Sequence, residues 1–241
     1  MDKMNNVVLH KEYSGFVRFF HWVRALSIFA LIATGFYIAY PFLQPNSSFY
    51  KGVYLLQAYV RSFHVMFGFL LISALIFRTY LFFTKESLME RRSFGQLLSP
   101  KAWIDQMKAY FLISGKPHTK GLYNPIQLVA YFTLVVLIVL MSLSGVVLYY
   151  NVYHAGLGAF LGSAFKWFEA LCGGLANVRF IHHLATWGFI LFVPVHVYMV
   201  FFHSIRYESS GADSMINGYG YTKKNESKNP NSRHWQYPFW R

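Results

Sequence analysis

Four long stretches without a charged side chain constrain the fold of this 241-residue chain more than any other feature. They run over 25–43, 62–77, 121–165 and 180–205, and the second continues through the apolar residues 80–83. A helix needs roughly 20 mostly apolar residues to cross a bilayer. Only 13% of the residues are charged, too few to solvate an ordinary soluble domain. We therefore expect transmembrane helices over about 16–41, 57–84, 124–151 and 180–206.

The predicted fold is an all-α integral membrane four-helix bundle, a single domain over 1–241 with short surface helices in its connections. The net charge is +13, but its distribution is a topology signal and does not indicate a nucleic-acid partner. Of the 22 basic residues, 18 lie in the first segment, the connection between the second and third helices, and the tail. The positive-inside rule then places both termini in the cytoplasm, as expected of a multi-pass protein of the bacterial inner membrane.

Local signals predict how the helices begin and what lies between them. Ser14 caps the first helix, which also serves as the insertion signal because no removable signal peptide precedes it. Ser99 and the following proline start an amphipathic helix that we expect along the membrane surface, and Asn124 opens the third transmembrane helix. Residues 157–171 form an apolar outer segment suited to docking another subunit. The polar tail over 208–241 is expected to be flexible or extended unless a partner holds it.

Histidines within the predicted spans are the main candidates for function, because ionisable groups at membrane depth are costly and usually functional. His182 and His196 are 14 residues apart, which places them about 40° from a common face and about 21 Å apart along a helix. His183 misses that face by about 140° by the same arithmetic, so His182 is the better ligand candidate. His203 is left either to a quinone site or to the surface.

Topology pairs the candidate ligands by depth. His21 and His196 each lie ten residues from a cytoplasmic basic residue, whereas His64 and His182 follow soon after their helices enter from outside. The predicted pairs are His64 with His182 near the outer face and His21 with His196 near the inner face. Neutral imidazole is a suitable axial ligand for haem iron, and a haem with both axial positions filled transfers electrons. The single cysteine excludes a CxxCH attachment site, so the predicted haems are b-type.

An arginine three residues before three of these histidines adds a second pattern. Arg18, Arg61 and Arg179 precede His21, His64 and His182, respectively. Residues at i and i+3 share a helix face, so these guanidinium groups are candidates for binding haem propionates. The alternative is that they mark helix ends and extend to the aqueous boundary.

Glycine gives a weaker hint of the same kind. Gly35 and Gly68 could let a macrocycle approach their helices, or they could serve ordinary helix packing.

Six segments resemble the b-type cytochrome subunit of membrane-bound nickel-iron uptake hydrogenases. They are VRFFHW over 17–22, RSFH over 61–64, NPIQ over 124–127, HHLATW over 182–187, HVYM over 196–199 and MINGY over 215–219. The histidine pattern alone is shared with the wider bacterial family that includes cytochrome b561. The resemblance implies the same four haem ligands, a hydrogenase with small and large subunits as partner, a possible dimer of the complex, and menaquinone or ubiquinone as electron acceptor.

The sequence therefore predicts a di-haem electron-transfer subunit that passes electrons from hydrogen oxidation outside to a quinone near the inner haem. An alternative in the same class is the cytochrome subunit of a formate dehydrogenase or related reductase. A rival from another class is a transporter that uses intramembrane histidines for protons or metal ions. Few carboxylates lie within the spans and no broken-helix repeat is evident, which counts against the transporter.

Overall fold

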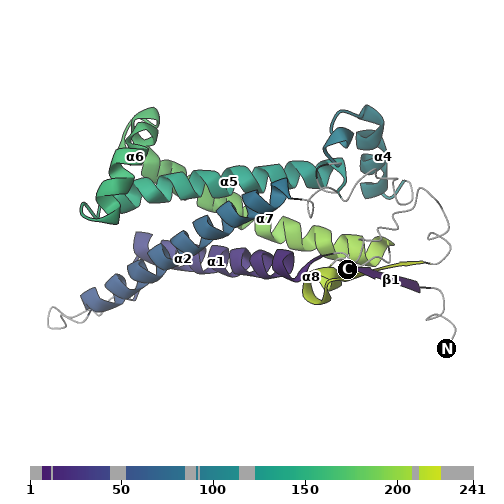
Figure 1. Ribbon diagram of the computed structural model, residues 1–241, viewed down its shortest axis with the longest axis horizontal. Helices are drawn as coiled ribbons and strands as arrows, with labels where there is room; N and C mark the ends of the chain where they lie inside the picture. Colours follow the sequence, from purple (N-terminus) through teal and green to yellow (C-terminus); the bar gives the residue numbers. More distant parts are fainter. Residues whose placement is uncertain are drawn as a thin grey trace. The chain divides into compact units, whose positions relative to one another are not determined.

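The long helices of the computed structural model match the predicted spans (Figure 1). Residues 7–11, 13–43, 53–84, 91, 93–113, 123–207 and 212–223 are described. The long helices are α1 (Gly15–Ala39), α2 (Val53–Phe83), α5 (Pro125–Tyr150) and α7 (Leu175–Tyr207). Each contains a segment long and apolar enough to cross a membrane, in agreement with the four predicted spans. The chain is thus a mostly α-helical, multi-pass membrane protein, and α7 starts five residues before the predicted boundary because the charged Arg179 is accommodated, exposed, within the helix.

Polar side chains cap the N-termini of three helices at the predicted residues. Ser14 Oγ accepts from the backbone N–H of Val17 at the start of α1. Asn124 and Gln127 form a reciprocal capping box before α5, with a proline in its first turn. Ser99 likewise caps the short helix α4 (Pro100–Tyr110), which follows the 3₁₀ turn η3 (Phe94–Gln96). These caps satisfy backbone N–H groups that a helix start leaves without partners.

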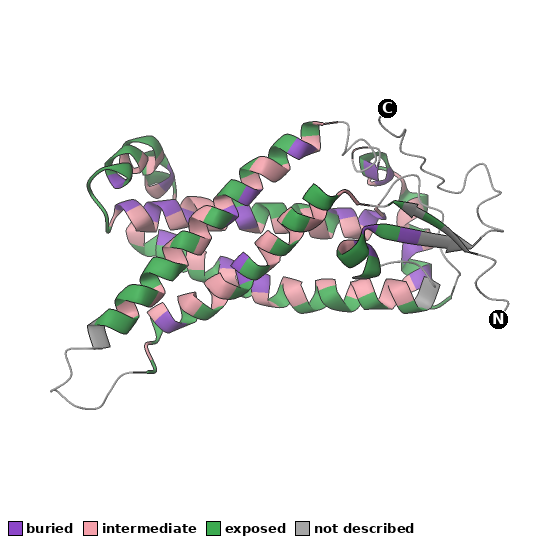
Figure 2. Cartoon of the chain, turned by 60° about the horizontal axis from the view of Figure 1, so that its bottom comes forward, coloured by how far each residue is buried: buried purple, intermediate pink, exposed green. Residues whose placement is uncertain are grey.

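Large apolar side chains are exposed along the four long helices. Figure 2 shows exposed and intermediate residues over most of each helix, with short buried patches between them. Phe19, Leu26, Met66, Phe132 and Leu191 are among these exposed side chains. A soluble protein would bury such surface, whereas a bilayer solvates it.

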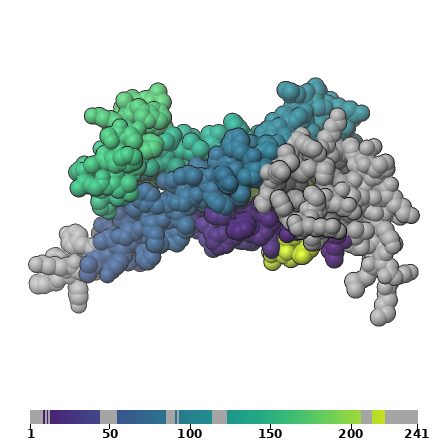
Figure 3. Space-filling view, in the orientation of Figure 1, coloured from purple at the N-terminus to yellow at the C-terminus, as the bar shows by residue number. Residues whose placement is uncertain are grey.

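The chain forms two compact units, one over residues 23–192 and one that combines residues 1–22 with 193–241. In the first unit, α6 (Leu157–Leu171) packs against the end of α5 around Val147, Phe168 and Val178. Figure 3 shows α6 and α4 projecting at opposite ends of α5. The predicted apolar segment over 157–171 is thus a helix, and whether it faces another subunit stays a prediction.

A polar contact joins α6 to the last turn of α5. The Tyr150 hydroxyl donates to Glu169 Oε2 at 2.5 Å, and Asn151 Nδ2 donates to the same oxygen at 3.2 Å. These two hydrogen bonds, with that from Tyr150 the larger influence, hold the pKa of the Glu169 carboxyl below its usual value. The carboxylate therefore remains charged at neutral pH and fixes α6 to α5 through two donors.

The second unit joins the two ends of the chain through a short antiparallel sheet. Strand β1 (Val7–Lys11) pairs with β2 (Tyr219–Lys223), and the helix α8 (Ala212–Asn217) precedes β2. Residues 212–223 of the predicted tail thus form α8 and an extended strand, and the N-terminal segment supplies the backbone partners of that strand. The pairing also places the two terminal segments beside one another; the rest of the predicted tail lies outside the described residues.

Candidate functional site

The structure brings together both predicted histidine pairs, each within one of the two units. The ring centroids of His64 on α2 and His182 on α7 are 6.3 Å apart, with an interplanar angle of 63°. Those of His21 on α1 and His196 on α7 are 6.4 Å apart, with an angle of 43°. All four histidines are partly buried. The pairing deduced from depth and helical spacing therefore matches the observed neighbours.

The spacing of each pair fits two imidazoles on opposite sides of one metal ion. An imidazole nitrogen lies about 2 Å from its metal and about 1 Å from its ring centre, so two axial rings are separated by about 6 Å. Among the described residues, no group of three or more His, Cys, Asp or Glu side chains is placed to hold a metal. Each pair thus offers two protein ligands, which suits a haem, whose macrocycle supplies the others.

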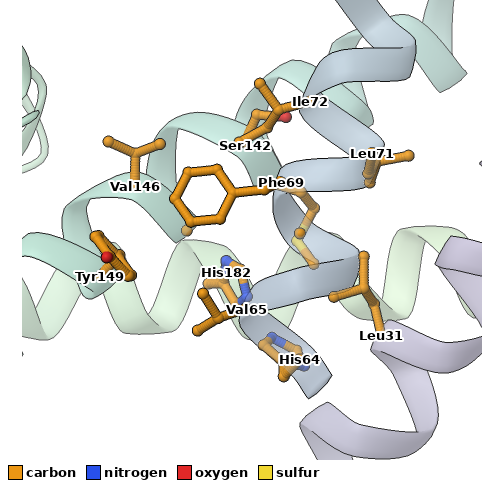
Figure 4. Close-up of a pocket in the computed structure, with 13 residues that line it drawn as sticks. Leu31, His64, Val65, Phe69, Leu71, Ile72, Ser142, Val146, Tyr149 and His182 are labelled. Carbon is orange, nitrogen blue, oxygen red and sulfur yellow. The ribbon is translucent and has the colours of Figure 1, made fainter. Parts of the chain in front are cut away.

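An apolar cavity adjoins the His64/His182 pair (Figure 4). Figure 4 shows both imidazoles at one side of the cavity, one on α2 and the other on α7. Gly68 and Gly145 also line it, and a Cβ at Gly68 would meet no atom within 4 Å. The remaining lining is mostly aliphatic and aromatic: Leu31, Val65, Phe69, Leu71, Ile72, Met141, Ser142, Val146 and Tyr149. Such a lining suits a flat apolar group held by two imidazoles.

Each imidazole of this pair is also hydrogen-bonded to a hydroxyl on a neighbouring helix. Thr34 Oγ1 of α1 lies 2.8 Å from His64 Nδ1, and Ser144 Oγ of α5 lies 2.8 Å from His182 Nδ1. Sequence reasoning missed both hydroxyls. The only signal was a hydroxyl residue followed by glycine in the middle of an apolar span, at Thr34-Gly35 and at Ser144-Gly145.

The other predicted site residues occupy varied surroundings. His183 is exposed beside the half-buried His182, and the ring of the partly buried His203 packs edge-on to Phe202. Arg61 and Arg179 are exposed one helical turn before their histidines. Their predicted contact with propionates stays a prediction.

Arg18, the third predicted propionate ligand, contacts the tail. Its Nη1 donates to the carbonyl of Ile216 at 2.5 Å. Trp22 Nε1, next to His21, donates to the carbonyl of Met215 at 3.1 Å. The tail therefore binds side chains on both sides of His21, and at least one amino group of Arg18 is already engaged.

Comparison with known proteins gives a consistent family assignment. The family model described as prokaryotic cytochrome b561 matches residues 12–218. A probable Ni/Fe-hydrogenase B-type cytochrome subunit of Cupriavidus necator is 30% identical over 217 residues, covering 86% of this chain and 85% of the relative. The protein of that name from Rhodobacter capsulatus is 26% identical, covering 86% and 79%. A probable Ni/Fe-hydrogenase 1 B-type cytochrome subunit of Escherichia coli is 26% identical, covering 90% and 93%.

Proposed function

Since the chain belongs to the prokaryotic cytochrome b561 family, we propose that it is a membrane-anchoring di-haem cytochrome b that passes electrons from a nickel-iron hydrogenase to quinone. The observation that carries this proposal is the pair of two-histidine sites, each at a spacing suited to one metal between two imidazoles. The names of the relatives favour a hydrogenase partner over a formate dehydrogenase.

In this proposal, His64 and His182 would hold one haem b, and His21 and His196 would hold the other. A haem with two imidazole ligands supplies one-electron transfer without an open position for substrate. The imidazoles would orient the haem, and the apolar walls beside His64 and His182 would keep water from it. Arg61 and Arg179 would offset the charge of propionates at the first site, and the charge of Arg18 would do so at the second.

The charge distribution supports the direction of electron flow. Most basic residues fall in the terminal segments and in the connection between α2 and α5, which the positive-inside rule assigns to the cytoplasm of a bacterial inner membrane. The His64/His182 site then faces outside, toward the small subunit of a hydrogenase whose large subunit oxidises hydrogen. The His21/His196 site faces inside, where menaquinone or ubiquinone accepts the electrons.

Haem analysis of the purified chain tests this function. Pyridine haemochrome quantification should give two haem b per polypeptide. Hydrogen added to the chain together with its co-purified hydrogenase should produce the reduced b-type absorption bands. A chain without such bands would instead point to a transporter that uses its membrane histidines for protons or metal ions.

A further inference from the structure

Two hydroxyl-glycine pairs, Thr34-Gly35 on α1 and Ser144-Gly145 on α5, contact the rings of His64 and His182. Each of the two helices thus supplies one hydroxyl and one glycine to one imidazole ring. In each case the hydroxyl bonds Nδ1 and the glycine lies against the Cε1 edge of the same ring. The repetition on two unrelated helices indicates a shared role toward the rings.

The hydrogen bonds fix where the protons lie. A hydroxyl has one proton, and Thr34 Oγ1 is 2.6 Å from the carbonyl of Ala30, which can only accept. Ser144 Oγ is likewise 2.6 Å from the carbonyl of Leu140. Both hydroxyl protons are therefore directed to the backbone, so each oxygen accepts from the imidazole. His64 and His182 consequently carry their proton on Nδ1 and present the lone pair of Nε2.

The glycines set how closely the rings approach the helix backbones. A Cβ at position 35 would lie 3.3 Å from His64 Cε1, which is tighter than ordinary contact. A Cβ at position 145 would lie 3.6 Å from His182 Cε1, which is ordinary contact. An added methyl group should therefore displace the ring of His64 but leave that of His182 nearly in place.

We propose that Thr34-Gly35 and Ser144-Gly145 are positioning pairs that fix the tautomer and ring orientation of His64 and His182 and so set the midpoint potential of their haem. This inference rests on the proposed function, because it takes a haem to be bound by these two rings. An acceptor on Nδ1–H makes an imidazole a stronger electron donor through Nε2 and thereby favours the oxidised metal. The two hydroxyls therefore lower the potential of this haem.

Two variants test the hydroxyls, and two more serve as controls. Thr34→Val and Ser144→Ala remove the acceptors with little change in volume. Thr79→Val and Ser73→Ala are matched controls, since each of these α2 hydroxyls bonds its own helix backbone and is exposed. We expect Thr34→Val and Ser144→Ala to retain two haems and to shift one midpoint potential to a more positive value. The low-spin ferric electron paramagnetic resonance signal of that haem should move too, while both controls resemble the unaltered protein.

An unchanged potential and an unchanged signal in both test variants, with both haems retained, would overturn the inference. If Thr34→Val loses a haem, Thr34→Ser decides, because it restores the acceptor. Recovery of the haem supports positioning through the hydroxyl, and continued loss contradicts it.

Further variants test the role of the glycines and the presence of a haem separately. Gly35→Ala should alter the resonance signal and Gly145→Ala should not, so equal effects would refute the steric part. A separate variant distinguishes failure of the proposed function from failure of this inference. If His64 does not hold a haem, His64→Ala should contain as many haems as the unaltered protein.

Discussion

Neighbouring histidines on α7 show how one residue of helical rotation separates a proposed haem ligand from a surface group. His182 faces His64 and bonds Ser144, whereas His183 is exposed. One step along a helix turns a side chain by about 100°, which is enough to remove it from the site. The chemical type of a residue therefore identifies a candidate ligand only together with its place on the helix.

His182→Ala should lose the haem between α2 and α7, whereas His183→Ala should retain both haems. The reason is that only position 182 presents its ring to His64. Pyridine haemochrome quantification of the two variants measures the difference, one haem per chain against two. Equal loss in both would mean that α7 is wound differently around this position.

Arg61→Ala and Arg179→Ala should make the His64/His182 haem harder to reduce. Each change removes a cation that offsets the negative charge of a propionate and of the added electron, so the midpoint potential should fall. Lys166→Ala on α6 is the control, since it removes an exposed cation that no histidine follows at the same spacing. If a redox titration gave the same shift in midpoint potential for all three variants, the two arginines would act only as general surface charges.

At the scale of elements, spacing along one helix and the pairing of histidines by depth could be predicted, whereas the hydroxyl contacts made from other helices could not. The 14-residue interval between His182 and His196 is local and follows from the helical repeat. The hydroxyls of Thr34 and Ser144 reach their imidazoles from other helices. The rotation of those helices is not encoded in an apolar pattern that is nearly uniform around each span.

The pairing of β1 with β2 escaped prediction for a related reason. The two strands are separated by some two hundred residues, and neither has an apolar core-facing pattern. The contact depends on backbone partners and on Arg18, which donates to the backbone carbonyl of Ile216. Every residue has such a carbonyl, so the sequence does not indicate which one accepts. The predicted role of Arg18 toward a propionate came from spacing alone, which cannot distinguish the two partners.

Gly218→Ala should loosen the tail from the start of α1. Gly218 has φ of 88°, a conformation that disfavours alanine by about 1–2 kcal/mol, or about tenfold in a local opening equilibrium. An added Cβ would also lie 3.1 Å from Arg18 Cζ and from the carbonyl oxygen of Tyr13. Hydrogen exchange of the β2 amides should accelerate accordingly.

Gly15→Ala is the matched control for this change, because a Cβ there meets no atom within 4 Å. Similar exchange rates in both variants would show that the tail does not depend on the backbone conformation of Gly218.

At the scale of the whole molecule, one chain offers two histidine pairs, the proposed haem sites, built from three of its four long helices. Helix α7 contributes one histidine to each pair, and α2 and α1 contribute the others. Proposed electron flow therefore depends on two sites that can be emptied one at a time.

His21→Ala should separate hydrogen oxidation from quinone reduction. This change removes a ligand from the His21/His196 pair and leaves His64, His182 and their hydroxyl partners untouched. In membranes that contain the hydrogenase, hydrogen should still reduce an artificial dye at the normal rate, because the partner carries out that step. Quinone reduction should be lost, since the electrons no longer have the second haem through which to reach the cytoplasmic side.

His183→Ala serves as the control and should support both reactions. Normal quinone reduction in His21→Ala would place the quinone at the His64/His182 haem and would refute the transmembrane route.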